Sequence, residues 1–425
     1  MIKANNPALT SWIEVKSESD FPIQNIPFGI VRTKENAVRP ATRIGDTVID
    51  LSVLADFGYF DHLEIDDLSV FYQPVLNPMI AVGKPYWTSI RQTLSDLFSV
   101  NNQDLQNDTE ARALAMLPVD EIQMSMPVVV GDYTDFYSSI EHATNVGIMF
   151  RDPDNALFPN WKHLPVGYHG RSSSIVVSGT DIHRPKGQTL PKEATNPIFG
   201  PSKLVDFELE MAFITGKGTA LGESVTTEQA NEYIFGMVLF NDLSARDMQK
   251  WEYIPLGPFL AKNFGSVISP WIVTLEALEP FRVDGPEQKP AVLPYLQSSG
   301  KNNYDIHLEV GLTPESGTET LLSQSNTKYL YWSINQQLAH QTVNGCNIRV
   351  GDMYGSGTIS GPTPGSYGSM LELSWQGTKP IPLNGGGERK FIQDNDTITM
   401  RGYCKKDKLR IGFGDCTTKI LPAKQ

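Results

Sequence analysis

Acidic and apolar residues alternate in the segment VDFELEM, at residues 205–211. Side chains alternate between the two faces of an extended strand, so Asp206, Glu208 and Glu210 are expected on one face. Three carboxylates on one face repel one another unless a cation lies between them. The face is therefore a metal site or an acidic surface exposed to solvent. Because solvated acidic strands are common, the segment alone slightly favours the second alternative.

A carboxylate and an imidazole lie close together in GDYTDFYSSIEH, at residues 131–142. If this segment is helical, Asp135 and His142 are seven residues apart and face the same way. The alternative is an ordinary helix start, in which Asp and Ser side chains cap the helix and His142 only packs against its neighbours.

Polar groups also follow an apolar strand in FNDLSARDMQ, at residues 240–249. If Asp242 starts a helix, Arg246 and Gln249 lie on one face of it, and the alternative is a capped, solvated helix. Together the three segments offer an all-oxygen ligand set, which suits Ca²⁺ or Mg²⁺ better than zinc or copper. The set consists of Asp135, Glu208, Glu210 and Asp242.

The elements that must position these groups are mostly strands. The chain has 425 residues, more than one core normally holds, so we expect two domains, at residues 1–125 and 126–425. In the first, FGIVRT and RIGDTVIDLSVL predict strands, and YWTSIRQTLSDLF, at residues 86–98, predicts a helix. The polar stretch NNQDLQNDTEARA is a linker, an exposed helix or a surface loop.

Apolar segments rich in β-branched residues predict several strands in the second domain. They lie at residues 128–133, 173–179, 203–216, 233–245 and 269–278. The polar, Pro-rich residues 284–305 predict a loop, and the periodicity of residues 329–343 predicts a helix. The expected fold class is mainly β with some helix (α+β).

Composition restricts the function further. With 40% hydrophobic and 20% charged residues, the chain is typical of a globular enzyme. The net charge of −13 argues against nucleic-acid and membrane-surface partners, although an anionic small molecule can still bind to local cations. The three cysteines predict neither a disulfide framework nor a thiolate zinc site. We find no secretory signal and no membrane-length apolar run, so we expect a cytoplasmic protein.

Several long blocks of the sequence resemble the signature blocks of the fumarylacetoacetase family, and they run in that family's order from about Phe21 to about Leu421. They are FPIQNIPFG, DYTDFYSSIEHATNVGIMFR, NWKHLPVGYHGRSSSIVVSGT, DFELEMAF, NDLSARDMQKWEYIPLGPFLAKNFG, QQLAHQTVNGCNIRVGD, SGTISGP and GSMLELSWQGTKPI. Because several blocks have ten or more residues, the match is highly specific.

The resemblance implies an N-terminal SH3-like β-barrel and a C-terminal catalytic domain built as a mixed β-roll. It also implies a homodimer with a small-molecule diketo acid as substrate. The implied reaction is the last step of tyrosine and phenylalanine breakdown, in which 4-fumarylacetoacetate and water give fumarate and acetoacetate.

The family's residue roles carry over onto matching positions of this sequence. The implied Ca²⁺ or Mg²⁺ ligands are Asp135, Glu208, Glu210 and Asp242. The implied general base and its orienting carboxylate are His142 and Glu372. The implied oxyanion donors are Arg246, Gln249 and Lys262. The implied substrate contacts are Tyr137, Arg151, Tyr168, Gln249, Tyr253 and Thr358. A second, Mg²⁺-associated cluster is implied at Lys262, Gly265 and Ser266.

Three positions depart from the family pattern without removing a catalytic group. Ser266 replaces the more frequent Thr and keeps the hydroxyl, Leu243 replaces a usual Trp beside a metal ligand, and Ile140 replaces a usual polar residue. Two other functions remain open. One is action on another β-diketo acid, such as an acylpyruvate, or a decarboxylase or isomerase reaction, although such relatives are shorter. The other is a Ca²⁺-stabilised binding module without activity.

Overall fold

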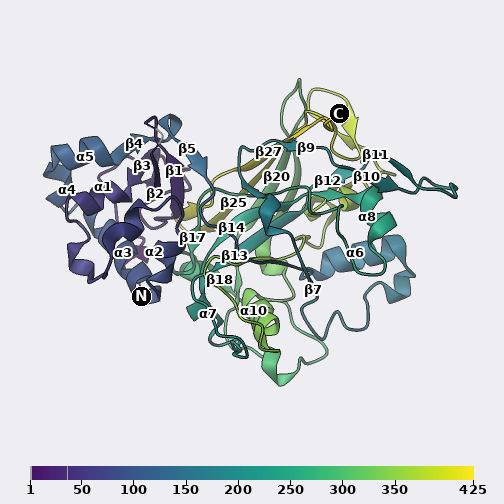
Figure 1. Cartoon of the computed structure of the whole chain (residues 1–425), viewed down its shortest axis with the longest axis horizontal. Helices are drawn as coiled ribbons and strands as arrows, with labels where there is room; N and C mark the ends of the chain where they lie inside the picture. Colours follow the sequence, from purple (N-terminus) through teal and green to yellow (C-terminus); the bar gives the residue numbers. More distant parts are fainter. Residues whose placement is uncertain (1, 36) are drawn as a thin grey trace.

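The computed structural model describes residues 2–35 and 37–425. The N-terminal part forms a five-stranded antiparallel sheet with short helices around it, and Figure 1 shows it as a separate purple lobe at one end of the molecule. In sheet order its strands are β4 (Met116–Pro118), β3 (Thr47–Asp50), β2 (Val38–Ile44), β1 (Phe28–Arg32) and β5 (Gln123–Ser125). Its helices are α1 (Leu51–Asp56), α2 (Asn77–Ala81), α3 (Lys84–Leu97), α4 (Asp104–Asn107) and α5 (Thr109–Ala115).

The local sequence explains these elements. The predicted strand FGIVRT is β1, and the predicted helix at residues 86–98 is α3. The segment RIGDTVIDLSVL, predicted as a strand, contains the end of β2, a turn at residues 45–46 and then β3. Strand β3 ends at Asp50, whose side chain accepts a hydrogen bond from the Ser52 N–H and caps α1. The polar residues 101–113 are not a linker but contain α4 and the start of α5, which packs on α1.

The C-terminal part contains an eight-stranded mixed sheet. Its main path runs β7 (Gly167–His169), β6 (Tyr133–Phe136), β22 (Met353–Gly355), β13 (Leu209–Thr215), β14 (Ile234–Asp242), β16 (Ser266–Ile268) and β8 (Ile175–Val177), and β17 (Val273–Thr274) also pairs with β14. The pairs β22–β6 and β16–β8 are parallel, whereas the others are antiparallel. The protein is therefore of the mixed α+β class, as predicted.

A six-stranded sheet packs against the eight-stranded one. It consists of β21 (Thr320–Asn326), β20 (His307–Thr313), β25 (Thr397–Lys406), β27 (Cys416–Leu421) and β9 (Ile182–His183), with β26 (Leu409–Gly412) paired to β25. Leu239 of β14 lies against β25 at Gly402, where a Cβ atom would come within 2.7 Å of Leu239 Cδ2. The absence of a side chain at Gly402 thus lets the sheets approach closely.

Short elements complete the C-terminal part. The paired short strands are β10 (Lys186–Thr189) with β11 (Ile198–Pro201), β12 (Val205–Asp206) with β15 (Ser244–Ala245), β18 (Arg282–Val283) with β19 (Asn303–Tyr304), and β23 (Ile381–Pro382) with β24 (Glu388–Arg389). The helices are α6 (Ile140–Phe150), α7 (Ala230–Tyr233), α8 (Arg246–Glu252), α9 (Leu275–Leu278), α10 (Ile334–Thr342) and α11 (Met370–Leu373).

Several predicted elements are corrected. Residues 131–142 are not one helix, because β6 is followed by a turn and α6 begins only at Ile140. The strand predicted at residues 128–133 begins only at Tyr133. The one predicted at residues 269–278 is limited to the short β17, after which Thr274 caps α9. The predicted helix at residues 329–343 is present as α10, which starts after a Ser333 capping box.

The N-terminal lobe shares a hydrophobic core with the eight-stranded sheet. The Phe235 ring of β14 lies 5.9 Å from the Phe28 ring of β1 and 5.1 Å from the Trp87 ring of α3. The backbones of Phe28 and Ile272 exchange two hydrogen bonds, of 2.9 and 2.8 Å. The lobe is therefore held to the C-terminal part by apolar packing as well as by backbone contacts.

Within residues 2–35 and 37–425, no helix is both long and apolar enough to cross a membrane.

Because the core is shared, we expect Phe235→Ala to lower the free energy of unfolding by about 3–5 kcal/mol. The Phe235 side chain is only 2% exposed, so its removal leaves a cavity between the two parts. Urea unfolding followed by tryptophan fluorescence and circular dichroism measures this loss. Leu221→Ala is the control, since Leu221 is 82% exposed and its truncation should change stability by less than about 0.5 kcal/mol. A Phe235 variant as stable as this control would contradict the shared core.

Candidate active site

Four buried carboxylates meet at one edge of the eight-stranded sheet. Asp135 comes from β6, Glu208 from the residues just before β13, Glu210 from β13 and Asp242 from the end of β14. One ligand oxygen from each lies within 4.8 Å of the others. These four residues are called the acidic cluster below. The structure thus brings together the ligand set suggested by the sequence, and the cluster could hold a metal ion.

A glycine in the intervening strand lets two of these carboxylates approach each other. Strand β22 lies between β6 and β13, and its Gly355 pairs with Asp135 on one side and Ala212 on the other. A Cβ atom at Gly355 would lie 3.0 Å from both Asp135 Oδ1 and Glu210 Oε2. Any side chain here would therefore crowd the site. Sequence reasoning missed Gly355, because its role depends on strand order.

The electrostatics of the acidic cluster favour a bound cation. Burial raises the pKa of Asp135 and of Glu210 well above the usual carboxyl range, and the nearby charges of Asp242 and Glu208 raise them further. Asp135 Oδ1 and Glu210 Oε1 are buried and have no hydrogen-bond partner in the described residues. Unpartnered buried oxygens are costly, and an all-oxygen site satisfies the ligand preference of a hard divalent cation. The residues present therefore fit Ca²⁺ or Mg²⁺.

Two cationic side chains, Lys262 and Arg246, contact Glu208 and offset part of the negative charge of the acidic cluster. Lys262 Nζ contacts Glu208 Oε2 and lies 2.7 Å from Asp242 Oδ2, while Arg246 Nη1 lies 2.7 Å from Glu208 Oε1. Burial opposes the ionisation of Glu208, but Lys262 and Arg246 outweigh it and hold its pKa below the usual value. Ser266 Oγ donates to Asp242 Oδ1 at 2.7 Å. Glu208 and Asp242 are therefore tied to fixed donors, unlike the free oxygens of Asp135 and Glu210.

Asp206 does not join the acidic cluster, although strand alternation predicted a shared face. The strand is interrupted between β12 and β13, so Asp206 instead accepts hydrogen bonds from the N–H groups of Met370 and Leu371, at 2.7 and 3.0 Å. Its Oδ2 also lies 2.8 Å from Arg246 Nε. Asp206 thus positions the Arg246 guanidinium.

One interpretation of the sequence had Asp242 starting a helix, but Asp242 is the last residue of β14. Helix α8 begins at Arg246, so Arg246 and Gln249 lie within one turn, and Arg246 Nη1 donates to Gln249 Oε1 at 3.2 Å. The buried Arg246 Nη2 has no partner in the described part of the chain. Nearby Gly265 packs against Ile182, to which a Cβ atom would come within 2.9 Å.

A second buried pair consists of an imidazole and a carboxylate. His142 Nδ1 lies 2.7 Å from Glu372 Oε2. Each of the two residues follows a serine N-cap by three positions, Ser139 for α6 and Ser369 for α11. His142 on α6 and Glu372 on α11 therefore face each other, although they are far apart in the sequence.

Glu372 accepts further hydrogen bonds that sequence reasoning missed. Asn145 Nδ2 donates to its Oε1 at 2.9 Å, and Ser369 Oγ donates to its Oε2 at 2.8 Å. Ser360 Oγ lies 2.9 Å from both oxygens. The spacing of His142 and Asn145, three residues apart on one helix, was the only local signal for this arrangement.

The residues implied as substrate contacts lie at different distances from these groups. The Tyr137 ring is 5.3 Å from the His142 ring, and the Tyr168 hydroxyl is 3.5 Å from Asp242 Oδ2. Thr358 is buried and directly follows Gly357, whose N–H donates to Glu210.

Two other implied contacts, Arg151 and Tyr253, make no hydrogen bond or ion pair with the acidic cluster within the described residues. The guanidinium of Arg151 bonds to the Ala156 carbonyl and stacks over Phe158, at 4.1 Å from the ring centre. Tyr253 is 50% exposed at the end of α8, and its side chain makes no hydrogen bond within the described residues.

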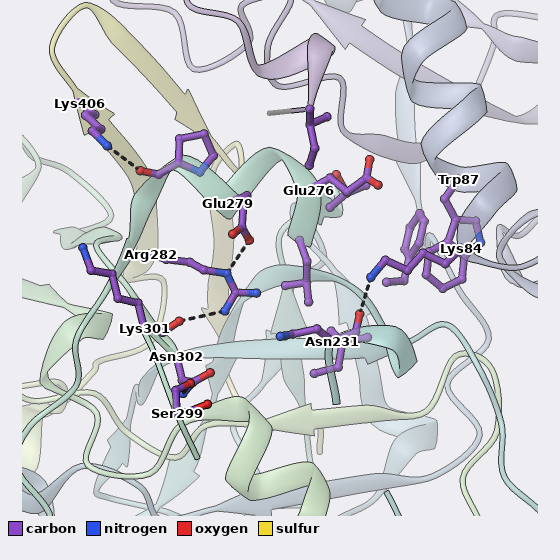
Figure 2. A pocket seen from close by; sticks show the side chains of 16 residues that line it. Lys84, Trp87, Asn231, Glu276, Glu279, Arg282, Ser299, Lys301, Asn302 and Lys406 are labelled. Carbon is purple, nitrogen blue, oxygen red and sulfur yellow. Dashed lines mark hydrogen bonds and ion pairs between the residues drawn. The ribbon is translucent and has the colours of Figure 1, made fainter. Parts of the chain in front are cut away.

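A cavity of about 740 Å³ borders helix α3 of the N-terminal lobe (Figure 2). Lys84 and Trp87 of α3 line it together with Ile234 and Phe235 at the start of β14. Asp242 is eight residues further along the same strand, which corresponds to about 26 Å at ~3.3 Å per residue. None of the predicted site residues lines this cavity.

Two family profiles match the chain. The profile described as "Fumarylacetoacetase N-terminal" matches residues 24–127, and the profile described as "Fumarylacetoacetate (FAA) hydrolase C-terminal" matches residues 133–421. Among solved structures, a fumarylacetoacetate hydrolase from Exiguobacterium antarcticum is similar over 94% of this chain and 100% of its own, with a TM-score of 0.53. At 17% identity, this likeness supports a shared fold alone.

Sequence relatives are much closer. The chain is 52% identical to the fumarylacetoacetase of Arabidopsis thaliana over 417 residues, which cover 98% of this chain and 99% of that protein. It is 52% identical to the Homo sapiens fumarylacetoacetase over 415 residues, covering 97% and 99% of the two chains. It is 53% identical to the Dictyostelium discoideum fumarylacetoacetase over 421 residues, covering 98% of each. The chain belongs to the fumarylacetoacetase family.

Proposed function

We propose how the residues of this site carry out the family's reaction. The chain hydrolyses 4-fumarylacetoacetate, the last step of tyrosine and phenylalanine breakdown, to fumarate and acetoacetate. The observation that carries the proposed mechanism is the buried His142–Glu372 pair, whose His142 is close enough to Glu208 of the acidic cluster to interact with its charge. Absorbance loss of fumarylacetoacetate, compared with that of an acylpyruvate, tests the substrate, and a preference for the acylpyruvate would overturn it.

Hydrolysis of a carbon–carbon bond needs a stabilised carbanion. A 1,3-diketone provides one, because the neighbouring carbonyl delocalises the charge as an enolate. Asp135, Glu208, Glu210 and Asp242 are proposed to hold Ca²⁺ or Mg²⁺. When bound, such a cation supplies Lewis-acid stabilisation of the developing negative charge. The residues Lys262, Gly265 and Ser266 are proposed as a second, Mg²⁺-associated cluster.

His142 is the proposed general base. Glu372 accepts a hydrogen bond at His142 Nδ1, so the proton is held there and Nε2 is free to take a proton from water. Glu372 also stabilises the imidazolium that forms, which is the role of the carboxylate in a catalytic triad. The activated water then attacks the carbonyl carbon of the substrate and gives a tetrahedral oxyanion. When this oxyanion collapses, the carbon–carbon bond breaks and its electron pair forms the enolate of acetoacetate. The proton that His142 took from water returns to the enolate carbon, which gives acetoacetate beside fumarate.

Cationic and amide donors are proposed to stabilise the oxyanion that this attack creates. Arg246, Gln249 and Lys262 have suitable groups, and the unpartnered Arg246 Nη2 is available to a substrate oxygen. The proposed contacts to the rest of the substrate are Tyr137, Arg151, Tyr168, Gln249, Tyr253 and Thr358. Phenols and a guanidinium suit its carboxylate groups.

Further properties of the family are proposed for this chain. The five-stranded N-terminal sheet is proposed to be an SH3-like β-barrel, the C-terminal part a mixed β-roll, and the boundary to lie near residue 125. The chain is proposed to form a cytoplasmic homodimer that binds neither nucleic acid nor membrane. The similarity to fumarylacetoacetases over nearly the whole chain supports these properties.

Replacing His142 by Ala should lower kcat by about 10²–10⁴-fold while a divalent cation still binds, because proton transfer is lost and the carboxylates remain. Steady-state kinetics and calcium titration of the same variant measure the two effects. Full turnover in His142→Ala would rule out the general-base role. If the variant lost both cation binding and turnover, His142 would have a structural role.

Cation binding should release protons. The pKa of Asp135, Glu210 and Asp242 is raised by burial, so the cluster of the metal-depleted protein retains protons at a pH where ordinary carboxyl groups are ionised. Since a cation needs the ionised forms, its apparent affinity should rise with pH up to these raised pKa values and fall below them. Calorimetric calcium titrations in two buffers of different ionisation enthalpy count the protons. Equal heats in both buffers would contradict the prediction.

Gly355→Ala should weaken cation binding by about 10–100-fold, because a methyl group would press on Asp135 and Glu210. Calcium titration calorimetry measures the affinity. Gly200→Ala is a suitable control, since a Cβ atom at Gly200 meets nothing within 4 Å. Equal affinities in the two variants would show that the glycine is not needed for the cluster.

A further inference from the structure

We propose that Asn145 and Ser360 are positioning residues, which orient the Glu372 carboxylate and keep it ionised for the reaction of His142. The inference rests on the proposed general-base role of His142. It adds two residues that act on the reaction only through Glu372.

The hydrogen bonds of Glu372 divide between its two oxygens. Oε2 lies 2.7 Å from His142 Nδ1 and 2.8 Å from Ser369 Oγ, whereas Oε1 accepts from Asn145 Nδ2 at 2.9 Å. Ser360 Oγ lies 2.9 Å from each oxygen. A carboxylate held at both oxygens cannot rotate, so the direction of the bond to His142 is set by Asn145 and Ser360.

Helix α6 carries two of these donors on one face. His142 and Asn145 are three residues apart, which places their side chains side by side. One rigid helix therefore contacts both oxygens of the same carboxylate. A shift of Glu372 that lengthened its contact with His142 would also disturb its contact with Asn145. Asn145 therefore helps to fix the position of the carboxylate relative to the imidazole.

Ser360 has one proton to donate, and its surroundings direct that proton to Glu372. Its Oγ accepts a hydrogen bond from the Gly368 N–H at 2.9 Å, which leaves the hydroxyl proton for the carboxylate. Ser139, the N-cap of α6, donates to the Ser360 carbonyl at 3.2 Å. Ser360 is thus fastened both to the helix that carries His142 and to the carboxylate that orients it.

Glu372 needs such partners because it is 1% exposed. Burial opposes its ionisation, but its partners, with His142 first among them, hold its pKa below the usual value. Hydrogen bonds to the ionised form favour that form, and a protonated Glu372 could not stabilise an imidazolium. The three neutral donors therefore preserve the charge when His142 is itself uncharged.

Of the three donors, Asn145 and Ser360 can be tested without removing a helix cap. Ser369 also accepts from the Glu372 N–H and begins α11, so its removal would disturb the helix as well. Asn145 is only partly buried, which makes a folded variant achievable.

The test compares Asn145→Ala, Ser360→Ala, Glu372→Gln and the double variant Asn145→Ala/Glu372→Gln in the full-length, metal-loaded enzyme. Each of the first two should lower kcat by about 10-fold or more, the range of one hydrogen bond to a charged group, with KM changed less than twofold. The double variant should have the kcat of Glu372→Gln alone, because Asn145 acts through Glu372.

Asn335→Ala is the matched control. The Asn335 amide also donates one 2.9 Å hydrogen bond from a helix, but its acceptor is the Thr227 backbone carbonyl and not Glu372, so its loss should lower the thermal midpoint without lowering kcat. Unchanged turnover in Glu372→Gln would overturn the His142–Glu372 mechanism itself. If Glu372→Gln is impaired, near-normal kcat in Asn145→Ala and Ser360→Ala, or additive losses in the double variant, would overturn the positioning role alone.

Discussion

The mutual repulsion of four buried carboxylates is the constraint on which the catalytic part of the molecule depends. Burial removes the water that would screen the acidic cluster, so its charges must be balanced by fixed cations, by protons or by a metal ion. Lys262 and Arg246 balance Glu208, but Asp135 and Glu210 each keep one oxygen that has no partner among the described residues. That incomplete balance is what makes the site suitable for a divalent cation.

The eight-stranded sheet is arranged to bring these charges together at one edge. Strand β22 separates β6 from β13, and Gly355 leaves room for carboxylates on both sides of it. Asp206, outside the acidic cluster, is also a buried carboxylate whose charge must be balanced. Its carboxylate pairs with the Arg246 guanidinium and accepts hydrogen bonds from two backbone N–H groups. Asp206, Glu208 and Asp242 are therefore paired with fixed cations, and these pairs determine where their side chains point.

The imidazole–carboxylate pair is built differently from the acidic cluster. Two short helices, each capped by a serine, present His142 and Glu372, and neutral donors surround the carboxylate. Such donors favour the ionised form of Glu372, which is the form that the proposed general-base role of His142 requires. The acidic cluster has few such donors, which leaves its oxygens available to a cation. Buried carboxylates thus occur in two settings in this protein. The carboxylate of Glu372 is surrounded by neutral donors, whereas those of the acidic cluster keep oxygens available to a cation.

Local periodicity by itself predicted β1, α3 and α10, because side-chain direction within one element is a short-range property. It also predicted that Glu208 and Glu210 share a face, but it did not predict that this face is buried. The long sequence blocks were enough to determine the family. Only the tertiary structure decided that Asp206 turns to Arg246 and that Asp135 lies on a strand. It also decided that Gly355 lies against two carboxylates of the acidic cluster and that Asn145 and Ser360 contact Glu372. These positions depend on partners far away in the chain, and no local pattern encodes such contacts.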